Sequence, residues 1–219
     1  MTSWRVCARN AAGVLERGHR KPVEWGIATR CRLGEAMSGD LGLVQLLPGG
    51  ALVAGIDGLG HGPEAARAAR RAAAVMRGSP GEDLVGLVQR CHTALRGTRG
   101  AAISLAFLSA SDDQMTWLGV GNVEGRMLSG DPAAPRPKGS LALGRGVPGH
   151  ELPSVQPATI GVQPGDVLLL ATDGVHAAFA DSLELSGSSQ AITERIVSDH
   201  WKRSDDALVI AVRYLGTRW

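Results

Sequence analysis

Aromatic residues are scarce in this 219-residue chain: five Trp, two Phe and one Tyr together make up 4% of it. Proteins that bind bases by stacking need a platform of aromatic side chains, and these few residues do not provide one. The net charge is only +2, with Lys and Arg scattered among acids instead of gathered in the basic stripe of a nucleic-acid reader. We therefore expect no nucleic-acid partner.

Cysteine is also rare, and the three positions are Cys7, Cys31 and Cys91. No two of them have the C-x-x-C spacing of a metal site, and three is an odd number for a disulfide framework. We interpret all three as reduced thiols of a cytosolic protein. The C-x₅-R loop with which tyrosine phosphatases hold phosphate is missing at Cys31 and Cys91, so neither is expected to act as a nucleophile.

Long hydrophobic runs are absent. No stretch approaches the roughly 20 apolar residues that span a bilayer. The N-terminal segment, MTSWRVCARNAAGVLERGHRK, lacks the apolar core of a secretory signal peptide. These absences predict a cytoplasmic, soluble protein without a membrane partner.

What the chain does have is enough length and apolar content, 44% of residues, for one substantial domain, which we expect to span residues 1–219. Periodicity and turn residues predict helices at about 63–77, 82–96 and 188–201. Strands are expected at 23–33, 41–47, 51–56, three times within 101–130, and at 154–162, 166–172 and 206–215. This order indicates an α+β fold with largely antiparallel sheets. The Pro- and Gly-rich segment 130–154 is expected to be a surface excursion.

Two apolar strands end on an aspartate followed by glycine, in ALVAGIDGLGHG (51–62) and DVLLLATDGV (166–175). These aspartates are Asp57 and Asp173; Asp40 precedes another strand, and Asp205 and Asp206 precede the last one. A single acid of this kind is usually a solvated turn residue. Strand ends in a sandwich gather at one rim, however, where several carboxylates can converge on hard divalent cations. Separate turn acids and a two-metal site are thus the two interpretations.

Common turn and loop motifs account poorly for the first Asp-Gly pair. Asp-Gly favours a type I′ hairpin, but here a helix follows the turn. Gly58, Gly60 and Gly62 match neither of the phosphate-binding patterns G-x-x-x-x-G-K-[ST] and G-x-G-x-x-G. The D-x-G-x-G loop of the histidine-kinase-like ATPases also differs from D-G-L-G. A carboxylate in such a loop would repel phosphate unless a metal ion lay between them.

Five motifs occur in a fixed order along the chain: SGD (38–40), DGLGHG (57–62), GVGNVEG (119–125), LLLATDGV (168–175) and SDDAL (204–208). Together they resemble the metal-dependent protein phosphatases, the PPM or type 2C class, in their bacterial SpoIIE-like branch. The ordered set is far more specific than any of its members. A free-standing catalytic domain of this size is most similar to the stressosome phosphatases of the RsbX type.

The resemblance implies a four-layer α-β-β-α sandwich of two mainly antiparallel sheets flanked by helices. It also implies two Mn²⁺ or Mg²⁺ ions at one rim. By this resemblance Asp57 would bridge the two ions, and the Gly58 carbonyl would bind one of them. Asp173 and Asp205 would hold the ion that Asp57 shares.

Two features of the motifs leave questions open. Asp40 is expected to act at the site either directly or through coordinated water, and Asp206 could replace Asp205 because the two are adjacent. Larger family members often carry His directly after the Asp-Gly pair, where this chain has Leu59. His61 lies two residues further on, and we expect it to cap the helix or to face solvent.

The resemblance further implies hydrolysis of phosphoserine and phosphothreonine on STAS-domain stressosome proteins of the RsbS and RsbR type, which would reset a stress-signalling switch. The reaction would be metal-assisted and would need no protein nucleophile. Arg30 and Arg32 are candidates for phosphate recognition, and Asn122 is expected to shape a turn. The alternatives are a SpoIIE- or RsbU-like phosphatase acting on an anti-anti-sigma factor, and a metal-free phosphatase-like binding scaffold.

Overall fold

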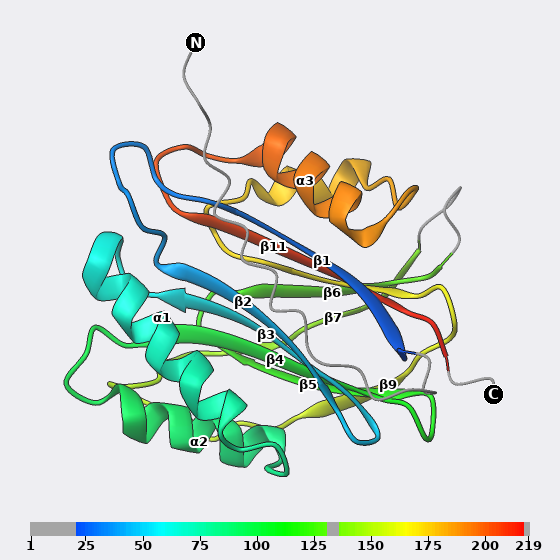
Figure 1. Cartoon of the computed structure of the whole chain (residues 1–219), viewed down its shortest axis with the longest axis horizontal. Helices are drawn as coiled ribbons and strands as arrows, with labels where there is room; N and C mark the ends of the chain where they lie inside the picture. The colour runs from blue at the N-terminus through cyan, green and yellow to red at the C-terminus, as the bar shows by residue number, and fades with distance from the viewer. Residues whose placement is uncertain (1–20, 131–135, 217–219) are drawn as a thin grey trace.

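Two β-sheets stacked face to face form the centre of the molecule, with helices on their outer sides (Figure 1). The computed structural model describes residues 21–130 and 136–216. Along the chain the elements are β1 (Val23–Arg30), β2 (Asp40–Leu47), β3 (Gly50–Gly58), α1 (Gly62–Arg77), α2 (Leu84–Leu95), β4 (Ala101–Ser109), β5 (Gln114–Val120), β6 (Glu124–Leu128), β7 (Pro137–Ser140), β8 (Leu143–Gly144), β9 (Ala158–Gly161), β10 (Val167–Ala171), η1 (Ala177–Ser182), α3 (Ser189–His200) and β11 (Ala207–Tyr214).

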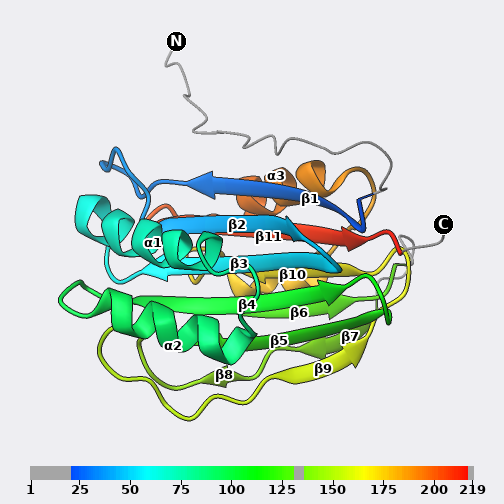
Figure 2. The same ribbon diagram turned by 60° about the horizontal axis from the view of Figure 1, so that its bottom comes forward.

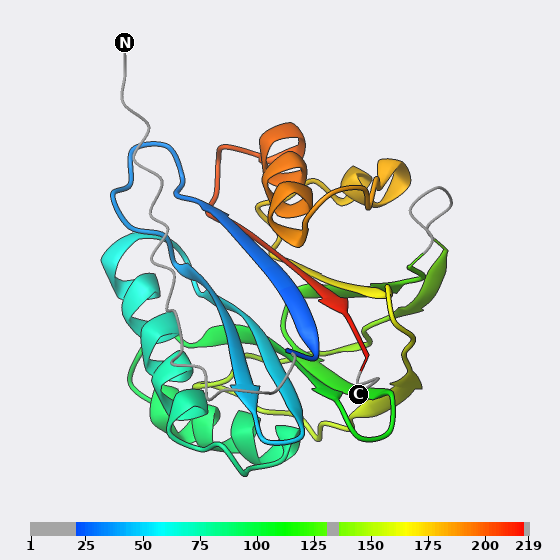
Figure 3. The same ribbon diagram turned by 45° about the vertical axis from the view of Figure 1, so that its right-hand side comes forward.

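The two sheets have the strand orders β1-β11-β10-β6-β7 and β2-β3-β4-β5-β8, and β9 also pairs with β5. All strand pairs are antiparallel except β5 with β8. Helices α1 and α2 cover the second sheet, whereas α3 and the 3₁₀ helix η1 lie on the first (Figures 1 and 3). This arrangement confirms the predicted α-β-β-α sandwich. None of the helices in the described residues is long and apolar enough to span a bilayer.

The central strands are apolar on both faces because each face packs against a different layer. On β3, Leu52 and Ile56 pack against α1 and α2, while Val53 points between the sheets. On β11, Ile210 lies between the sheets and Val209 packs against α3. Alternate residues of a strand point to opposite faces. Burial of both faces therefore explains why these strands appear in the sequence as continuous apolar runs.

The predicted helices are confirmed to within two residues at each end, but the segment 130–154 differs from the expected surface excursion. Residues 131–135 lie outside the described residues, and the rest contributes a strand to each sheet: β7 pairs with β6, and β8 pairs with β5. Both are short edge strands that face solvent on much of their length. Such strands carry no hydrophobic alternation, so periodicity did not indicate them.

Gly26 marks the place where α3 lies closest to its sheet. A Cβ atom at this position would lie 2.3 Å from the backbone N and Cα of Gln190, in the first turn of α3. Gly26→Ala should therefore lower the free energy of unfolding by about 1–3 kcal/mol, the usual cost of forcing extra volume into a packed interior. Equilibrium unfolding in urea measures this difference.

Gly81→Ala is the matched control, because nothing lies within 4 Å of the added Cβ. Its free energy of unfolding should stay within about 0.5 kcal/mol of the wild type. Equal stabilities of the two variants would contradict the close packing of α3 on β1.

Candidate metal centre

The predicted acids lie at one end of the sandwich, where strand ends from both sheets meet (the left-hand end in Figure 2). Asp40 begins β2 and pairs in register with Asp57, the penultimate residue of β3. Asp173 follows β10, and Asp205 and Asp206 precede β11. All five line a single cavity of about 130 Å³, together with Leu59, Gly60 and Asn122. The structure thus brings together acids that are up to 166 positions apart in the chain.

Asp206 and Asp205 have different environments, although they are adjacent in the sequence. Asp206 is 3% exposed, and its two carboxylate oxygens accept hydrogen bonds from the backbone N–H groups of Arg32 (2.8 Å) and Gly39 (2.7 Å). This side chain therefore fastens the β1–β2 loop to the start of β11. Asp205 is more exposed, and its Oδ1 accepts a hydrogen bond only from the N–H of Asp206 among the described residues. Asp205 is the freer of the two to bind a ligand.

Thr172 connects the two sheets directly at the cavity. Its hydroxyl donates to Oδ2 of Asp40 (2.7 Å) and accepts from the backbone N–H of Leu208 (2.8 Å). Asp40, on one sheet, is thereby oriented by β10 and β11 of the other. Thr172 was not among the predicted site residues. Its position between a buried strand and Asp173 is the sequence feature that could have indicated its role at the site.

Asn122 has a larger role than the turn expected for it. The turn between β5 and β6 does contain Gly121, with a φ of 103° that favours glycine. The Asn122 amide, however, lines the cavity and donates to Oδ2 of Asp173 (2.7 Å). Hydrogen bonding of the Asn122 side chain to Asp57 also favours the charged form of Asp57, which partly opposes the rise in the pKa of that carboxyl.

The carboxylates destabilise one another's charged forms. Burial, followed by the charge of Asp173, raises the pKa of Asp57 to about 7. Burial, followed by the charge of Asp57, raises the pKa of Asp40 well above its ordinary value. In the described residues no Lys, Arg or His forms an ion pair with any of the five carboxylates. The cavity therefore holds negative charge that the protein itself does not balance.

Hard divalent cations fit this donor set, because Mg²⁺ and Mn²⁺ prefer carboxylate, carbonyl and water oxygens. Within residues 21–130 and 136–216, no three His, Cys, Asp or Glu side chains are gathered as the ligands of a single ion. An ion in the cavity would then complete its coordination with water, as Mg²⁺ commonly does.

Several other predicted residues lie outside the cavity lining. Gly58 is required for packing, because a Cβ there would lie 2.2 Å from the carbonyl oxygen of Ala65 in α1. Arg30 donates through Nη1 to the carbonyl of its neighbour Thr29. The part of Arg32 that reaches the site is its backbone N–H.

His61 occupies the N-cap position of α1, but its side chain makes no capping hydrogen bond. Its Nδ1 instead lies 2.6 Å from Oε1 of Glu35, and the imidazole is 42% exposed. The expected capping role is therefore wrong, while the expected exposure is correct. The reason is the β1–β2 loop, which places a carboxylate beside the imidazole.

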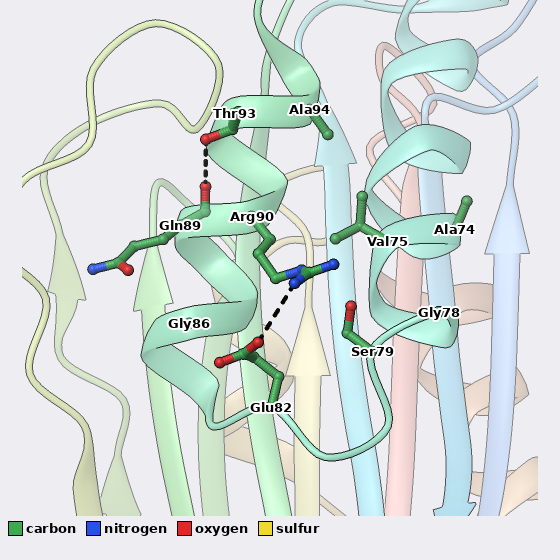
Figure 4. Close-up of a pocket in the computed structure, with 10 residues that line it drawn as sticks. All are labelled: Ala74, Val75, Gly78, Ser79, Glu82, Gly86, Gln89, Arg90, Thr93 and Ala94. Carbon is green, nitrogen blue, oxygen red and sulfur yellow. Dashed lines mark hydrogen bonds and ion pairs between the residues drawn. The ribbon is translucent and has the colours of Figure 1, made fainter.

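A larger hollow of about 580 Å³ lies on the surface between α1 and α2 (Figure 4). Its one acid, Glu82, is 3.7 Å from the guanidinium of Arg90, and its Thr93 hydroxyl donates to the carbonyl of Gln89 in the same helix. Glu82, Arg90 and Thr93 thus have partners, the buried Ser79 hydroxyl has none among the described residues, and no carboxylates converge there. The acid cavity is therefore the candidate site, despite its smaller volume.

Comparison with known proteins identifies the family. Residues 48–215 match the family model described as stage II sporulation protein E (SpoIIE). The chain belongs to the SpoIIE family. This family, of the PP2C type, and the structural neighbours of the chain are serine/threonine protein phosphatases, which confirms the enzyme class predicted from the motifs. No curated protein sequence matches the chain.

Solved structures agree with this assignment. One, from work described as "The bacterial stressosome: a modular system that has been adapted to control secondary messenger signaling", is 34% identical, with a TM-score of 0.77 over 87% of this chain and 99% of that chain. RsbX in complex with magnesium is 20% identical, with a TM-score of 0.76 over 90% and 98%. The Mycobacterium tuberculosis phosphatase PstP/Ppp is 15% identical, with a TM-score of 0.69 over 88% and 99%, which shows a shared fold.

The excess negative charge of the cavity leads to a prediction about thermal stability. Mn²⁺ should raise the melting temperature of the protein, because an ion that binds only the folded state stabilises it by about 2.7 kcal/mol at 100 times its Kd. Asp57→Asn removes one of the repelling charges. This variant should melt at a higher temperature than the wild type in EDTA and should gain less from Mn²⁺. Thermal unfolding in EDTA and in Mn²⁺ measures both effects.

The control is Asp199→Asn, on the exposed face of α3 and away from the cavity. It should keep the wild-type response to Mn²⁺. If Asp57→Asn and Asp199→Asn respond identically to the ion, the cavity is not where the metal binds.

Proposed function

We propose that this phosphatase removes phosphate from phosphoserine and phosphothreonine on STAS-domain stressosome proteins of the RsbS and RsbR type, and so resets a stress-signalling switch. The observation that carries the proposal is the cavity of five aspartates at the junction of the two sheets, none of which forms an ion pair within the described part of the chain. The choice of substrate is supported by the 34% identity to a protein from stressosome work and by the fold shared with RsbX.

The proposed ligands of two Mn²⁺ or Mg²⁺ ions are Asp57, Asp173, Asp205 and Asp40. Asp57 would be shared by both ions, because it pairs in register with Asp40 and lines the same cavity as Asp173 and Asp205 from the other sheet. The freer carboxylate of Asp205 favours it over Asp206, whose oxygens already accept two backbone hydrogen bonds. The Gly58 carbonyl remains a predicted ligand of one ion.

Divalent ions bound in such a site lower the pKa of water and neutralise charge on phosphoryl oxygens. The protein's own residues fix the geometry that this chemistry needs. Thr172 holds the carboxylate of Asp40 in one orientation, and Asn122 does the same for Asp173. Small displacements of such groups lower the rate of the catalysed reaction, so the fixed orientation of these carboxylates is part of what the protein contributes to catalysis.

A thiol nucleophile has little support. Cys91 is fully buried beneath α1, where its Sγ donates to the carbonyl of Ala72 and burial raises its pKa to about 12. The reactive form of cysteine is the thiolate, which is negligible at neutral pH with such a pKa. Cys31 does not line the acid cavity.

The experiment that tests the proposal is phosphate release from phosphorylated RsbS-type and RsbR-type STAS proteins, with a phosphorylated anti-anti-sigma factor in the same panel. Hydrolysis should require Mn²⁺ or Mg²⁺, stop in EDTA and resume when the ion is restored. The stressosome proteins should be the better substrates by kcat/KM. Asp57→Asn should lower kcat by about 100-fold or more, as expected for the loss of a main electrostatic group of an active site.

Asp199→Asn serves again as the control and should keep wild-type activity. A preference for the anti-anti-sigma factor would overturn the stressosome assignment in favour of a SpoIIE- or RsbU-like role. Absence of both hydrolysis and metal binding would instead favour a phosphatase-like binding scaffold.

A further inference from the structure

The loop between α2 and β4 carries Arg99 to the mouth of the acid cavity. Its backbone is firmly held: Thr98 Oγ1 donates to the carbonyl of Leu95 (2.6 Å) and accepts from the N–H of Gly100 (3.1 Å). His150 Nε2 lies 2.9 Å from the carbonyl oxygen of Arg99. These contacts leave the guanidinium as the part of this residue that is free to meet a ligand.

The guanidinium lies against Gly60, a residue of the cavity wall, although Arg99 itself is not among the residues that line the cavity. Leu59 and Gly60 form that wall, and the N–H of Leu59 donates to the carbonyl of Gly100 (3.1 Å), which fixes the two loops side by side. A Cβ atom on Gly60 would lie 2.7 Å from Nη1 of Arg99. The side chain of Arg99 therefore occupies the space that any residue other than glycine would need. Gly60 also has a φ of 84°, which favours glycine independently.

Two other cationic side chains near the mouth have contacts of their own. His61 is paired with Glu35, and Nζ of Lys202 donates to the backbone carbonyl of Asp173. Arg99, by contrast, is exposed and forms no ion pair within the described part of the chain. An arginine without an acidic partner, beside a residue that lines the acid cavity, is available to bind an anion there.

The balance of charges in the cavity explains why binding of an anion would require Arg99. Two divalent cations would bring four positive charges to a cavity lined by five carboxylates. A phosphate monoester, with close to two negative charges, would then enter a site that is still net negative. A guanidinium supplies the missing positive charge. Its planar set of donors also matches phosphoryl oxygens better than an ammonium does.

We propose that Arg99 binds the phosphoryl group of the substrate at the mouth of the acid cavity. This inference rests on the proposed phosphatase function and assigns Arg99 the role that the sequence suggested for Arg30 or Arg32. None of the three arginines is among the residues that line the cavity, but Arg99 is the one whose Nη1 lies beside the lining residue Gly60, whereas Nη1 of Arg30 donates to the carbonyl of Thr29.

The test measures binding of inorganic phosphate by calorimetry to the full chain supplied with saturating Mg²⁺. Arg99→Gln should raise the Kd for phosphate at least about tenfold, the loss expected when a charged hydrogen-bond donor is removed. Arg99→Lys should raise it less, because the charge remains but the fork of donors is lost. Arg96→Gln, three residues earlier and also exposed, should leave the Kd unchanged.

A kinetic arm identifies which anion is bound. Arg99→Gln should raise KM for both p-nitrophenyl phosphate and a phosphoserine peptide, since the phosphoryl group is all that the two share. An increase confined to the peptide would mean that Arg99 binds a carboxylate beside the phosphosite, and would overturn the proposal. Each variant should keep its thermal stabilisation by Mg²⁺, which shows that fold and metal binding are intact.

The two proposals fail in different ways. If the wild type hydrolyses phosphate esters with Mg²⁺ but Arg99→Gln matches Arg96→Gln in phosphate affinity, the inference about Arg99 is wrong and the phosphatase function stands. If the wild type neither binds inorganic phosphate nor hydrolyses the esters, both are wrong. A larger effect of Lys202→Gln than of Arg99→Gln on the Kd for phosphate would assign the role to Lys202 instead.

Discussion

The site depends on one constraint, which is the repulsion among its carboxylates. The fold holds these carboxylates together at the junction of the two sheets. Burial and the neighbouring charges raise the pKa of Asp57 to about 7 and that of Asp40 well above its usual value. An arrangement that disfavours its own charged state is costly for a folded protein unless something else is bound there. Divalent cations would remove that cost, and the carboxylates would then serve as their ligands.

The sandwich keeps these groups together because each sheet supplies part of the set. Antiparallel pairing of β2 with β3 places Asp40 opposite Asp57, while β10 and β11 bring Asp173 and the Asp205–Asp206 pair from the other sheet. The hydroxyl of Thr172 joins the two halves. Three separate apolar layers, one between the sheets and one beneath each set of helices, provide the rigidity that this junction needs.

Much of this organisation could be predicted from the sequence, because the signals were local. Apolar runs indicated the central strands, and an aspartate before or after such a run marked each ligand candidate. The contacts that Thr172 and Asn122 make at the site could not be predicted in this way. Each depends on a partner distant in the chain: Thr172 contacts a residue 132 positions away, and Asn122 contacts one 51 positions away. The edge strands β7 and β8 were missed because strands of two to four largely exposed residues have no hydrophobic period to detect.

The most direct test of the central claim is a crystal structure of the protein grown with Mn²⁺, with anomalous differences measured at the manganese edge. The account predicts two anomalous peaks inside the acid cavity, with the carboxylate of Asp57 between them and Asp205, not Asp206, as a ligand. Manganese bound elsewhere, or a cavity with no anomalous peak at saturating Mn²⁺, would contradict it.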